Sequence, residues 1–237
     1  MYKVIGIDEA GKGPVLGSMF IGFSIITLVD GLKSLNDFQD KLGTDFGVKD
    51  SKLLTPKKRA EVFEKLRGAI DMKYAQLTPA LIDKNFFEGG KLNNLEVDAI
   101  VQILNAERPD LVIIDALTAN PGRFGSELQD KLKFDCKVVS ENKADSKYTV
   151  VGAASIIAKE LREKEIQEIK DKVGINVGSG YPADPNTKEF LKNNYNNKEF
   201  DFIFRKSWAT YQNLLPESER MTPKVKEVNP NKTLFDY

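Results

Sequence analysis

The stretch KVIGIDEAGKGPVLGSMFIGFSIITL, residues 3–28, determines how the fold begins. Residues 3–7 are mostly apolar and β-branched, which predicts a β-strand. Residues 19–28, rich in Ile and Phe, predict a second strand. The intervening residues 11–17 include three glycines. We therefore expect a hairpin whose two strands are joined by a glycine-rich loop.

The rest of the chain predicts alternating helices and strands. A Thr-Pro pair at 55–56 is typical of an N-cap followed by proline in the first helical turn, and Asn93 with Glu96 resembles a capping box. The apolar run at 111–114 suits a buried strand. We expect further elements at 136–139 (a strand), 148–172 (a long helix, its first half buried), 187–194 and 205–215 (short helices). This order predicts a mixed α/β fold with a small helical appendage.

Composition narrows the class of protein. The 237 residues are 41% hydrophobic and 30% charged, which is ordinary for a globular chain. The 35 basic residues balance 35 acidic ones, so a nucleic-acid-binding surface would have to be a local patch. The absence of histidine excludes Ser-His-Asp and Cys-His nucleophiles and imidazole zinc sites. A single cysteine, with no signal peptide and no long apolar run, predicts a cytoplasmic protein without a membrane segment.

Four acidic residues lie where strands end or a helix begins. Asp8 and Glu9 follow the first strand, which we expect to end at Ile7 because successive strand residues face opposite sides. Asp115 follows the buried strand, and Asp145 precedes the long helix. Carboxylates gathered in one crevice repel one another unless a hard cation neutralises them. The pattern favours Mg²⁺, and two such ions would activate a water and stabilise the leaving oxygen in phosphodiester cleavage.

These positions also have plainer interpretations. Asp145 alone would be an N-cap and Asp115 alone a turn residue, so only the group of four indicates a site. Residues 6–13, GIDEAGKG, match seven of the eight places of the phosphate-binding loop GxxxxGK[ST]. Gly13 replaces the hydroxyl residue, and the two carboxylates within the loop would repel phosphate, which argues against an NTPase.

Five blocks of sequence carry a family resemblance. They are GIDEAGKGPVLGSM (6–19), DSKLL (50–54), VIIDAL (112–117), ENKADSKYTVVGAASIIAK (141–159) and GSGYPADP (178–185). Together they resemble the type 2 ribonucleases H, and the last resembles the archaeal branch, ribonuclease HII. The resemblance implies a ribonuclease H-like mixed β-sheet flanked by helices, with a small C-terminal helical region. It also implies cleavage of the RNA strand of RNA–DNA hybrids, including single ribonucleotides embedded in duplex DNA.

The resemblance assigns roles residue by residue. Asp8, Glu9, Asp115 and Asp145 would be catalytic and bind Mg²⁺ or Mn²⁺, with two ions expected when substrate is bound. Metal-activated water would attack the phosphorus on the 5′ side of the ribonucleotide, leaving a 3′-hydroxyl and a 5′-phosphate. The family usually has arginine at position 12, and lysine keeps the charge but loses the bidentate fork. The implied substrate contacts are Gly11, Lys12, Gly13, Ser51, Lys52, Lys143, Arg162 and Tyr181, the tyrosine lying against the sugar.

The last seven residues, NKTLFDY at 231–237, resemble the peptide by which replication and repair enzymes dock on the ring-shaped sliding clamp. Leu234 and Tyr237 would form its apolar anchor in one 3₁₀ turn, although the tail could instead pack on its own domain or stay loose. A Gly- and Pro-rich stretch at 174–185 marks a boundary. We expect a monomer with a catalytic domain (1–177), a C-terminal helical region over the cleft (178–216) and a tail (217–237).

Two rival functions stay open at this point. The chain could be a non-catalytic hybrid-binding subunit that needs partners, although all four acidic positions are present. It could also be a different nuclease on the same fold, such as a strand-transfer or junction-cutting enzyme. The DSK and GSGYP blocks favour the ribonucleotide-directed branch over that second rival.

Overall fold

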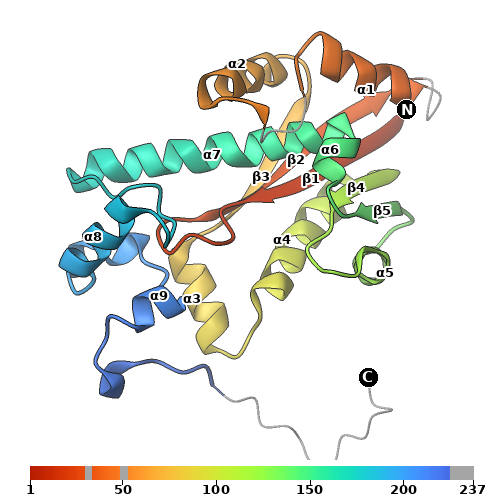
Figure 1. Ribbon diagram of the computed structural model, residues 1–237. Coiled ribbons are helices and arrows are strands. Elements are labelled where there is room, and N and C mark those ends of the chain that lie inside the picture. Colours follow the sequence, from red (N-terminus) through yellow and green to blue (C-terminus); the bar gives the residue numbers. More distant parts are fainter. Residues whose placement is uncertain (30–33, 49–52, 225–237) are drawn as a thin grey trace, which may run out of the picture.

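The computed structural model describes residues 1–29, 34–48 and 53–224, and a five-stranded mixed β-sheet forms its centre (Figure 1). The strand order is β3-β2-β1-β4-β5. β2 pairs antiparallel with β1 and β3, whereas β4 runs parallel to β1 and β5. The predicted hairpin and mixed sheet are therefore confirmed. The strands are β1 (Tyr2–Ala10), β2 (Met19–Leu28), β3 (Asp71–Leu77), β4 (Leu111–Asp115) and β5 (Lys137–Glu141).

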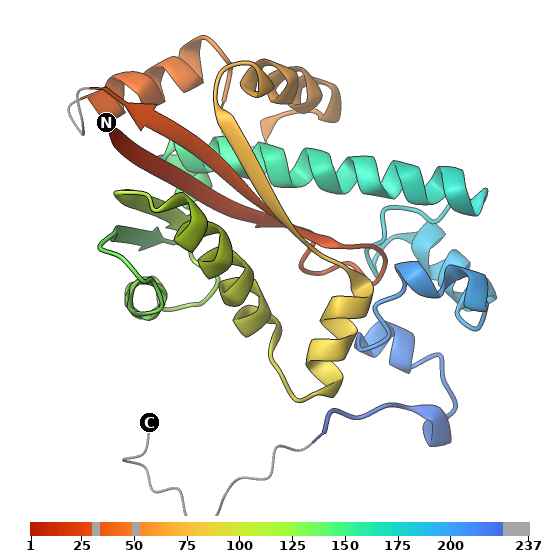
Figure 2. The ribbon, with the colours of Figure 1, turned by 180° about the vertical axis from the view of Figure 1, so that it is seen from behind.

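Helices cover both faces of the sheet. α7 crosses β1 and β2 on one face with α1 and α2 beside it, while α3, α4 and α5 lie on the other (Figures 1 and 2). The helices are α1 (Leu35–Thr44), α2 (Pro56–Arg67), α3 (Pro79–Phe87), α4 (Leu92–Glu107), α5 (Pro121–Asp130), α6 (Ala144–Lys147), α7 (Thr149–Val173), α8 (Pro185–Asn194) and α9 (Ala209–Gln212), with 3₁₀ segments η3 (Lys198–Ile203) and η4 (Glu217–Glu219).

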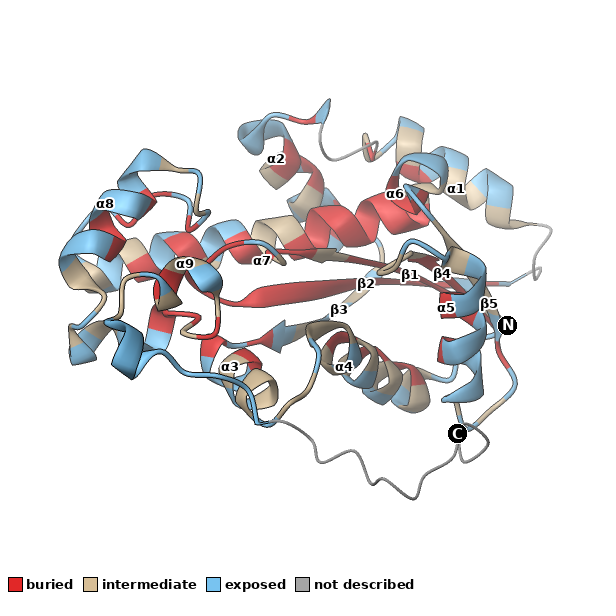
Figure 3. Ribbon diagram, turned by 60° about the horizontal axis from the view of Figure 1, so that its bottom comes forward, coloured by how far each residue is buried: buried red, intermediate tan, exposed pale blue. Residues whose placement is uncertain are grey.

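Alternation along β1 supplies a separate core to each face. Val4 packs into the cluster under α7, whereas Ile5 and Ile7 pack with α4 and α5 on the opposite side. Strands β1 and β2 are consequently buried along most of their length between the helical layers (Figure 3). This sandwich holds the ends of β1 and β4 rigidly in place, and the acidic residues lie at those ends.

Two glycines allow α7 to lie against the sheet with its backbone almost touching the strands. A Cβ atom on Gly6 would stand 2.4 Å from the carbonyl oxygen of Val150, and one on Gly22 would stand 2.3 Å from that of Ala154. Neither distance is possible between real atoms, so only glycine fits at these two positions. The absence of side chains there brings the buried half of α7 next to the acidic end of β1.

Several predicted elements are confirmed and three details are wrong. The Thr55 cap, the buried strand of β4 and the long helix α7 are present as expected. β1, however, continues past Ile7 to Ala10, because β2 remains paired with it to that point. The capping box does not form, because α4 begins one residue before Asn93. The pattern at 205–215 contributes only the short α9.

Residues 178–224 lie at one end of the molecule, beside the loop between β1 and β2 (Figure 1). The N–H of Val15 donates to the Gly180 carbonyl at 2.8 Å, and Leu16 forms an isolated β-bridge with Phe204. The division into domains after residues 177 and 216 stays a prediction. Across residues 1–29, 34–48 and 53–224, no helix has the length and apolar character that crossing a membrane requires.

Candidate active site

Two adjacent parallel strands bring three of the four acidic residues to one edge of the sheet. β1 carries Asp8 and Glu9, and β4 ends at Asp115. Ile7 is in register with Ile114, so Asp8 and Asp115 occupy corresponding positions on neighbouring strands. The register of the two strands therefore places their carboxyl groups side by side.

Asp145 joins them through α6. The N–H of Ala144 donates to Asp115 Oδ1 at 3.1 Å, which attaches the first turn of α6 to the end of β4. Asp145 is the next residue and is buried, and its charge acts on Asp8. The four acidic residues named from the sequence are therefore brought together, although they come from three separate segments.

The electrostatics of the cluster are those of crowded, desolvated carboxylates. Burial raises the pKa of Asp8 to about 6, and the charges of Asp115 and Asp145 add to the effect. Burial also raises the pKa of Glu9 to about 8, with Asp8 and Glu96 contributing. Within the described ranges, no group of three or more acidic or cysteine side chains is arranged to hold a metal ion as it stands.

Asp8 and Glu9 face opposite sides of the sheet, because β1 continues through both residues. Asp8 lies toward α7, where the Ser155 hydroxyl and the N–H of Glu9 donate to its carboxylate. Glu9 lies on the α4 side, where the charge of Glu96 reaches it. The prediction that the strand ends at Ile7 is wrong, so the two carboxylates lie on opposite faces of the sheet and the site includes both faces.

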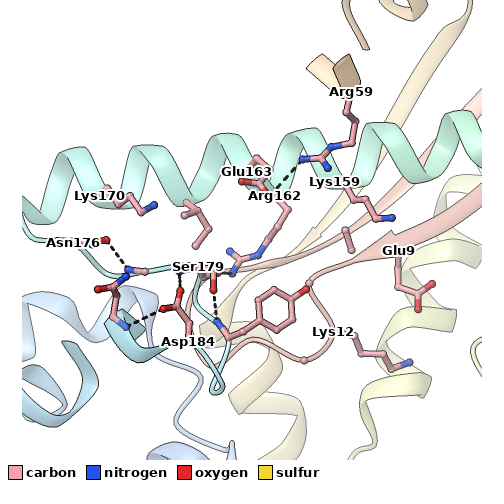
Figure 4. Close-up of a pocket in the computed structure, with 17 residues that line it drawn as sticks. Glu9, Lys12, Arg59, Lys159, Arg162, Glu163, Lys170, Asn176, Ser179 and Asp184 are labelled. Carbon is pink, nitrogen blue, oxygen red and sulfur yellow. Dashed lines mark hydrogen bonds and ion pairs between the residues drawn. The ribbon is translucent and has the colours of Figure 1, made fainter. Parts of the chain in front are cut away.

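A pocket of about 690 Å³ extends from Glu9 along α7 (Figure 4). Glu9 and Lys12 lie near one end of it, and Lys170 and Asn176 near the other. Gly11, Lys12 and Gly13 form part of its wall, as do Arg162 and Tyr181. The glycine-rich loop therefore lines a cavity directly beside the acidic cluster.

Lys12 has a partner that the sequence interpretation missed. Its Nζ lies 2.8 Å from Oε2 of Glu96, a carboxylate with no exposed surface. Glu96 shares the buried face of α4 with Ile100 and Leu104, at spacings of four residues. An acidic residue within such an apolar stripe needs a compensating partner, and that signal was available in the sequence.

The remaining predicted contacts differ in their placement. Tyr181 is half exposed, and its ring would touch a Cβ atom on Gly13 at 3.6 Å, so it stands opposite the loop. Arg162 is buried, and its Nη2 donates to the Leu16 carbonyl while its Nη1 pairs with Glu165. These contacts make it part of the pocket wall and give it protein partners. Lys143 is exposed in a left-handed conformation just before α6, while Ser51, Lys52, Leu234 and Tyr237 lie outside the described residues.

Solved structures with the same fold define the class of protein. The ribonuclease H2 of Pyrococcus horikoshii is similar with a TM-score of 0.78 and 40% identity, covering 90% of this chain and 96% of that one. The ribonuclease HII in the PCNA:RNase HII complex from Archaeoglobus fulgidus is similar with a TM-score of 0.75 and 33% identity, covering 90% and 97%. The chain therefore has the fold of a type 2 ribonuclease H.

Sequence comparison narrows this class to one family. The family model for ribonuclease HII matches residues 5–211. The ribonuclease HII of Thermococcus sibiricus is 42% identical over 218 residues, covering 90% of this chain and 91% of the relative. The chain belongs to the ribonuclease HII family, and it is an enzyme of the nuclease class.

Proposed function

We propose that this enzyme hydrolyses the RNA strand of RNA–DNA hybrids, including single ribonucleotides within duplex DNA. It cuts on the 5′ side of the ribonucleotide and leaves a 3′-hydroxyl and a 5′-phosphate. The observation that carries the proposal is a cluster of four carboxylates, one of which, Glu9, lines a pocket together with Gly11, Lys12 and Gly13. Only a ribonucleotide offers a 2′-hydroxyl to such a loop, and that group distinguishes RNA from DNA.

We infer that Asp8, Glu9, Asp115 and Asp145 hold a divalent cation, Mg²⁺ or Mn²⁺, with two ions bound in the presence of substrate. The donor set fits, because it consists of four carboxylates, the oxygen ligands that these ions prefer. The pKa values of two of them, Asp8 and Glu9, are raised by burial and by neighbouring negative charge. When bound, such ions supply charge neutralisation and lower the pKa of water. The protein itself supplies the alignment, since β1, β4 and α6 hold the carboxyl groups at one edge.

The surrounding residues bind and orient the nucleic acid. Backbone groups of Gly11, Lys12 and Gly13 contact the ribose hydroxyl and the adjacent phosphate. The Tyr181 ring, standing opposite Gly13, packs against the sugar. Lys12 lines the same pocket and contributes positive charge there, and its ammonium group is paired with Glu96. Ser51, Lys52, Lys143 and Arg162 are proposed as further contacts.

A cleavage assay tests the function. A DNA duplex with one ribonucleotide is incubated with Mg²⁺, with Mn²⁺ and with chelator, and the product ends are mapped. We expect a metal-dependent nick on the 5′ side of the ribonucleotide. No cleavage with either metal would favour a non-catalytic subunit that depends on partners. Cleavage of long hybrids alone would overturn the proposal that the enzyme recognises single ribonucleotides in duplex DNA.

The Asp115→Asn variant tests the carboxylate cluster. Asparagine keeps an Oδ1 that can accept from Ala144, so the attachment of α6 survives while the charge is lost. We expect turnover to fall by at least about 100-fold, as for loss of an electrostatic group aimed at the reacting centre. Duplex binding in chelator should change little, measured by fluorescence anisotropy. A cleavage rate in Mg²⁺ near that of the wild type would refute the proposed catalytic role of the carboxylate cluster.

We also propose that the protein is a monomer and that its tail at 231–237 binds the sliding clamp. The support is its resemblance to clamp-binding peptides, together with the PCNA complex solved for the Archaeoglobus fulgidus relative. Deleting residues 231–237 should abolish binding to the clamp, measured by surface plasmon resonance, and leave hybrid cleavage unchanged. Undiminished clamp binding by the shortened chain would end this proposal.

A further inference from the structure

The loop between β1 and β2 is held by a residue nearly 200 positions away in the sequence. Arg205 has no exposed surface, and its guanidinium donates three hydrogen bonds to loop carbonyl oxygens. Nη2 donates to Gly11 at 2.7 Å, Nη1 to Lys12 at 3.1 Å and Nε to Gly17 at 2.8 Å. One side chain therefore fixes the loop at both its ends.

Two further residues complete this arrangement. The Nε1 of Trp208 donates to the Gly13 carbonyl at 3.3 Å. Asp83, on α3, accepts from the N–H of Lys206 at 2.8 Å and from the N–H and hydroxyl of Ser207 at 2.9 and 2.6 Å. Asp83 thus fastens the segment that carries the arginine and the tryptophan to the body of the protein.

The positive charge of Arg205 is stabilised by backbone carbonyl oxygens and not by an ion pair with a carboxylate. In the part of the chain that the structure describes, no acidic side chain forms an ion pair with it. Burial lowers the pKa of the guanidinium to about 9, so it remains charged at neutral pH. A buried charge is costly unless its donors are satisfied, and here peptide carbonyls accept from three of the five N–H groups of the guanidinium.

The direction of these bonds determines where the loop amides point. In a trans peptide the N–H lies opposite the carbonyl of the preceding residue. With the carbonyls of Gly11 and Lys12 turned to Arg205, the N–H groups of Lys12 and Gly13 point away from it. Neither of those amides has a protein acceptor among the described residues, and both residues line the pocket. Two adjacent donors are thereby left available to a ligand oxygen.

The geometry points to Asp83, Arg205 and Trp208 as positioning residues, a loop brace that keeps the Lys12 and Gly13 amides turned toward the ribonucleotide. The inference rests on the proposed function, because the ligand oxygen is that of the ribose hydroxyl or its phosphate. The brace touches no reacting atom. It makes affinity for the ribonucleotide depend on residues of the C-terminal region and α3.

The test compares two aromatic variants of the same C-terminal region. Trp208→Phe removes the bond to the loop, whereas Tyr211→Phe removes a bond of Tyr211 to the Tyr195 carbonyl, which does not reach the loop. We expect Trp208→Phe to raise KM for a single-ribonucleotide duplex by up to about tenfold, as for one lost hydrogen bond, with kcat changed less. Tyr211→Phe should leave KM unchanged. Arg205→Lys, which keeps the charge but loses the fork, should raise KM further.

Hydrogen exchange supplies a readout that needs no activity. The amide of Gly17 donates to the Ile203 carbonyl, so its exchange rate reports how firmly the loop is held. Arg205→Lys and Trp208→Phe should speed its exchange, and Tyr211→Phe should not. Equal effects of the two aromatic variants on KM and on exchange would overturn the brace. If Arg205→Lys does not fold, the comparison of Trp208→Phe with Tyr211→Phe still tests the loop brace. If the wild-type protein does not cleave at a ribonucleotide, the proposed function fails, but the exchange rate of the Gly17 amide still tests whether these residues hold the loop.

Discussion

Glu9 carries a carboxylate into a half-buried position beside two other acidic side chains, Asp8 and Glu96. Burial and those neighbours raise its pKa to about 8. The folded, metal-free protein therefore binds a proton at Glu9 that the unfolded chain releases above about pH 4.5. Unfolding releases that proton, so the free energy of unfolding contributed by Glu9 falls as the pH rises between these two values.

Replacing Glu9 by glutamine should therefore stabilise the metal-free protein. At pH 8 we expect Glu9→Gln to raise the free energy of unfolding by on the order of 1–3 kcal/mol, since one pKa unit corresponds to about 1.4 kcal/mol. At pH 5 the wild-type side chain is protonated and the two proteins should differ little. Urea denaturation in chelator at both pH values measures this, with the exposed Glu217→Gln as control. A variant less stable than the wild type at pH 8 would contradict the electrostatic account.

At the residue scale, the sequence identified the acidic residues of the site but not the side chains that pair with the site residues. The position of Asp115 followed from the end of the apolar run at 111–114, because a strand end depends on local sequence, whereas Asp8 lies within a strand that continues to Ala10. The pairing of Lys12 with Glu96 spans 84 residues and depends on how α4 packs on the sheet. Glu96 was assigned to a capping box because Asn93 stands three residues before it, and that local spacing says nothing of the helix face that becomes buried.

The close contact of α7 with the central strands is the element-scale feature that places the site. Gly6 and Gly22 leave room for the backbone of α7, and the helix in turn presents Ser155 to Asp8. The sequence of α7, with its run of small apolar residues, predicted burial of its first half. It did not predict which strand positions would have to be glycine, because that depends on the distance between helix and sheet.

Gly22→Ala should separate α7 from the sheet. The new methyl group would stand 2.3 Å from the carbonyl oxygen of Ala154, which is backbone and cannot rotate away. We expect the free energy of unfolding to fall by about 1–3 kcal/mol, as for overpacking of a core. Ribonucleotide cleavage should fall as well, because the contact between Ser155 and Asp8 is disturbed.

A second glycine provides the matched control. A methyl group at Gly43, in helix α1, would lie 3.7 Å from its nearest neighbour, and alanine favours a helix by up to about 1 kcal/mol. Gly43→Ala should therefore be neutral or stabilising in the same denaturation experiment. If Gly22→Ala were equally harmless, the helix would be free to move and the close contact would not fix the site.

On the scale of the whole molecule, the regions before and after residue 177 share a hydrophobic core. Val15 and Leu16, from the loop between β1 and β2, pack with Phe190 and Phe204 of the C-terminal region. α7 contributes to the same cluster. A composition change at 174–185 marks the place where the chain leaves α7, and sequence alone cannot show that the chain then returns to cover a loop near its start.

Ending the chain after residue 177 should therefore leave an incomplete protein rather than an independent catalytic domain. The truncation would expose Val15 and Leu16 and remove Arg205, so the loop beside the acidic cluster would lose both its apolar cover and its hydrogen bonds. We expect the shortened chain to lose cooperative unfolding, followed by circular dichroism and calorimetry, and to cleave no duplex. A chain ending after residue 224 should retain one sharp transition and full cleavage. A native-like, cooperative 1–177 fragment would instead show that the two regions are separate domains that merely touch, because a shared core cannot be divided without unfolding what remains.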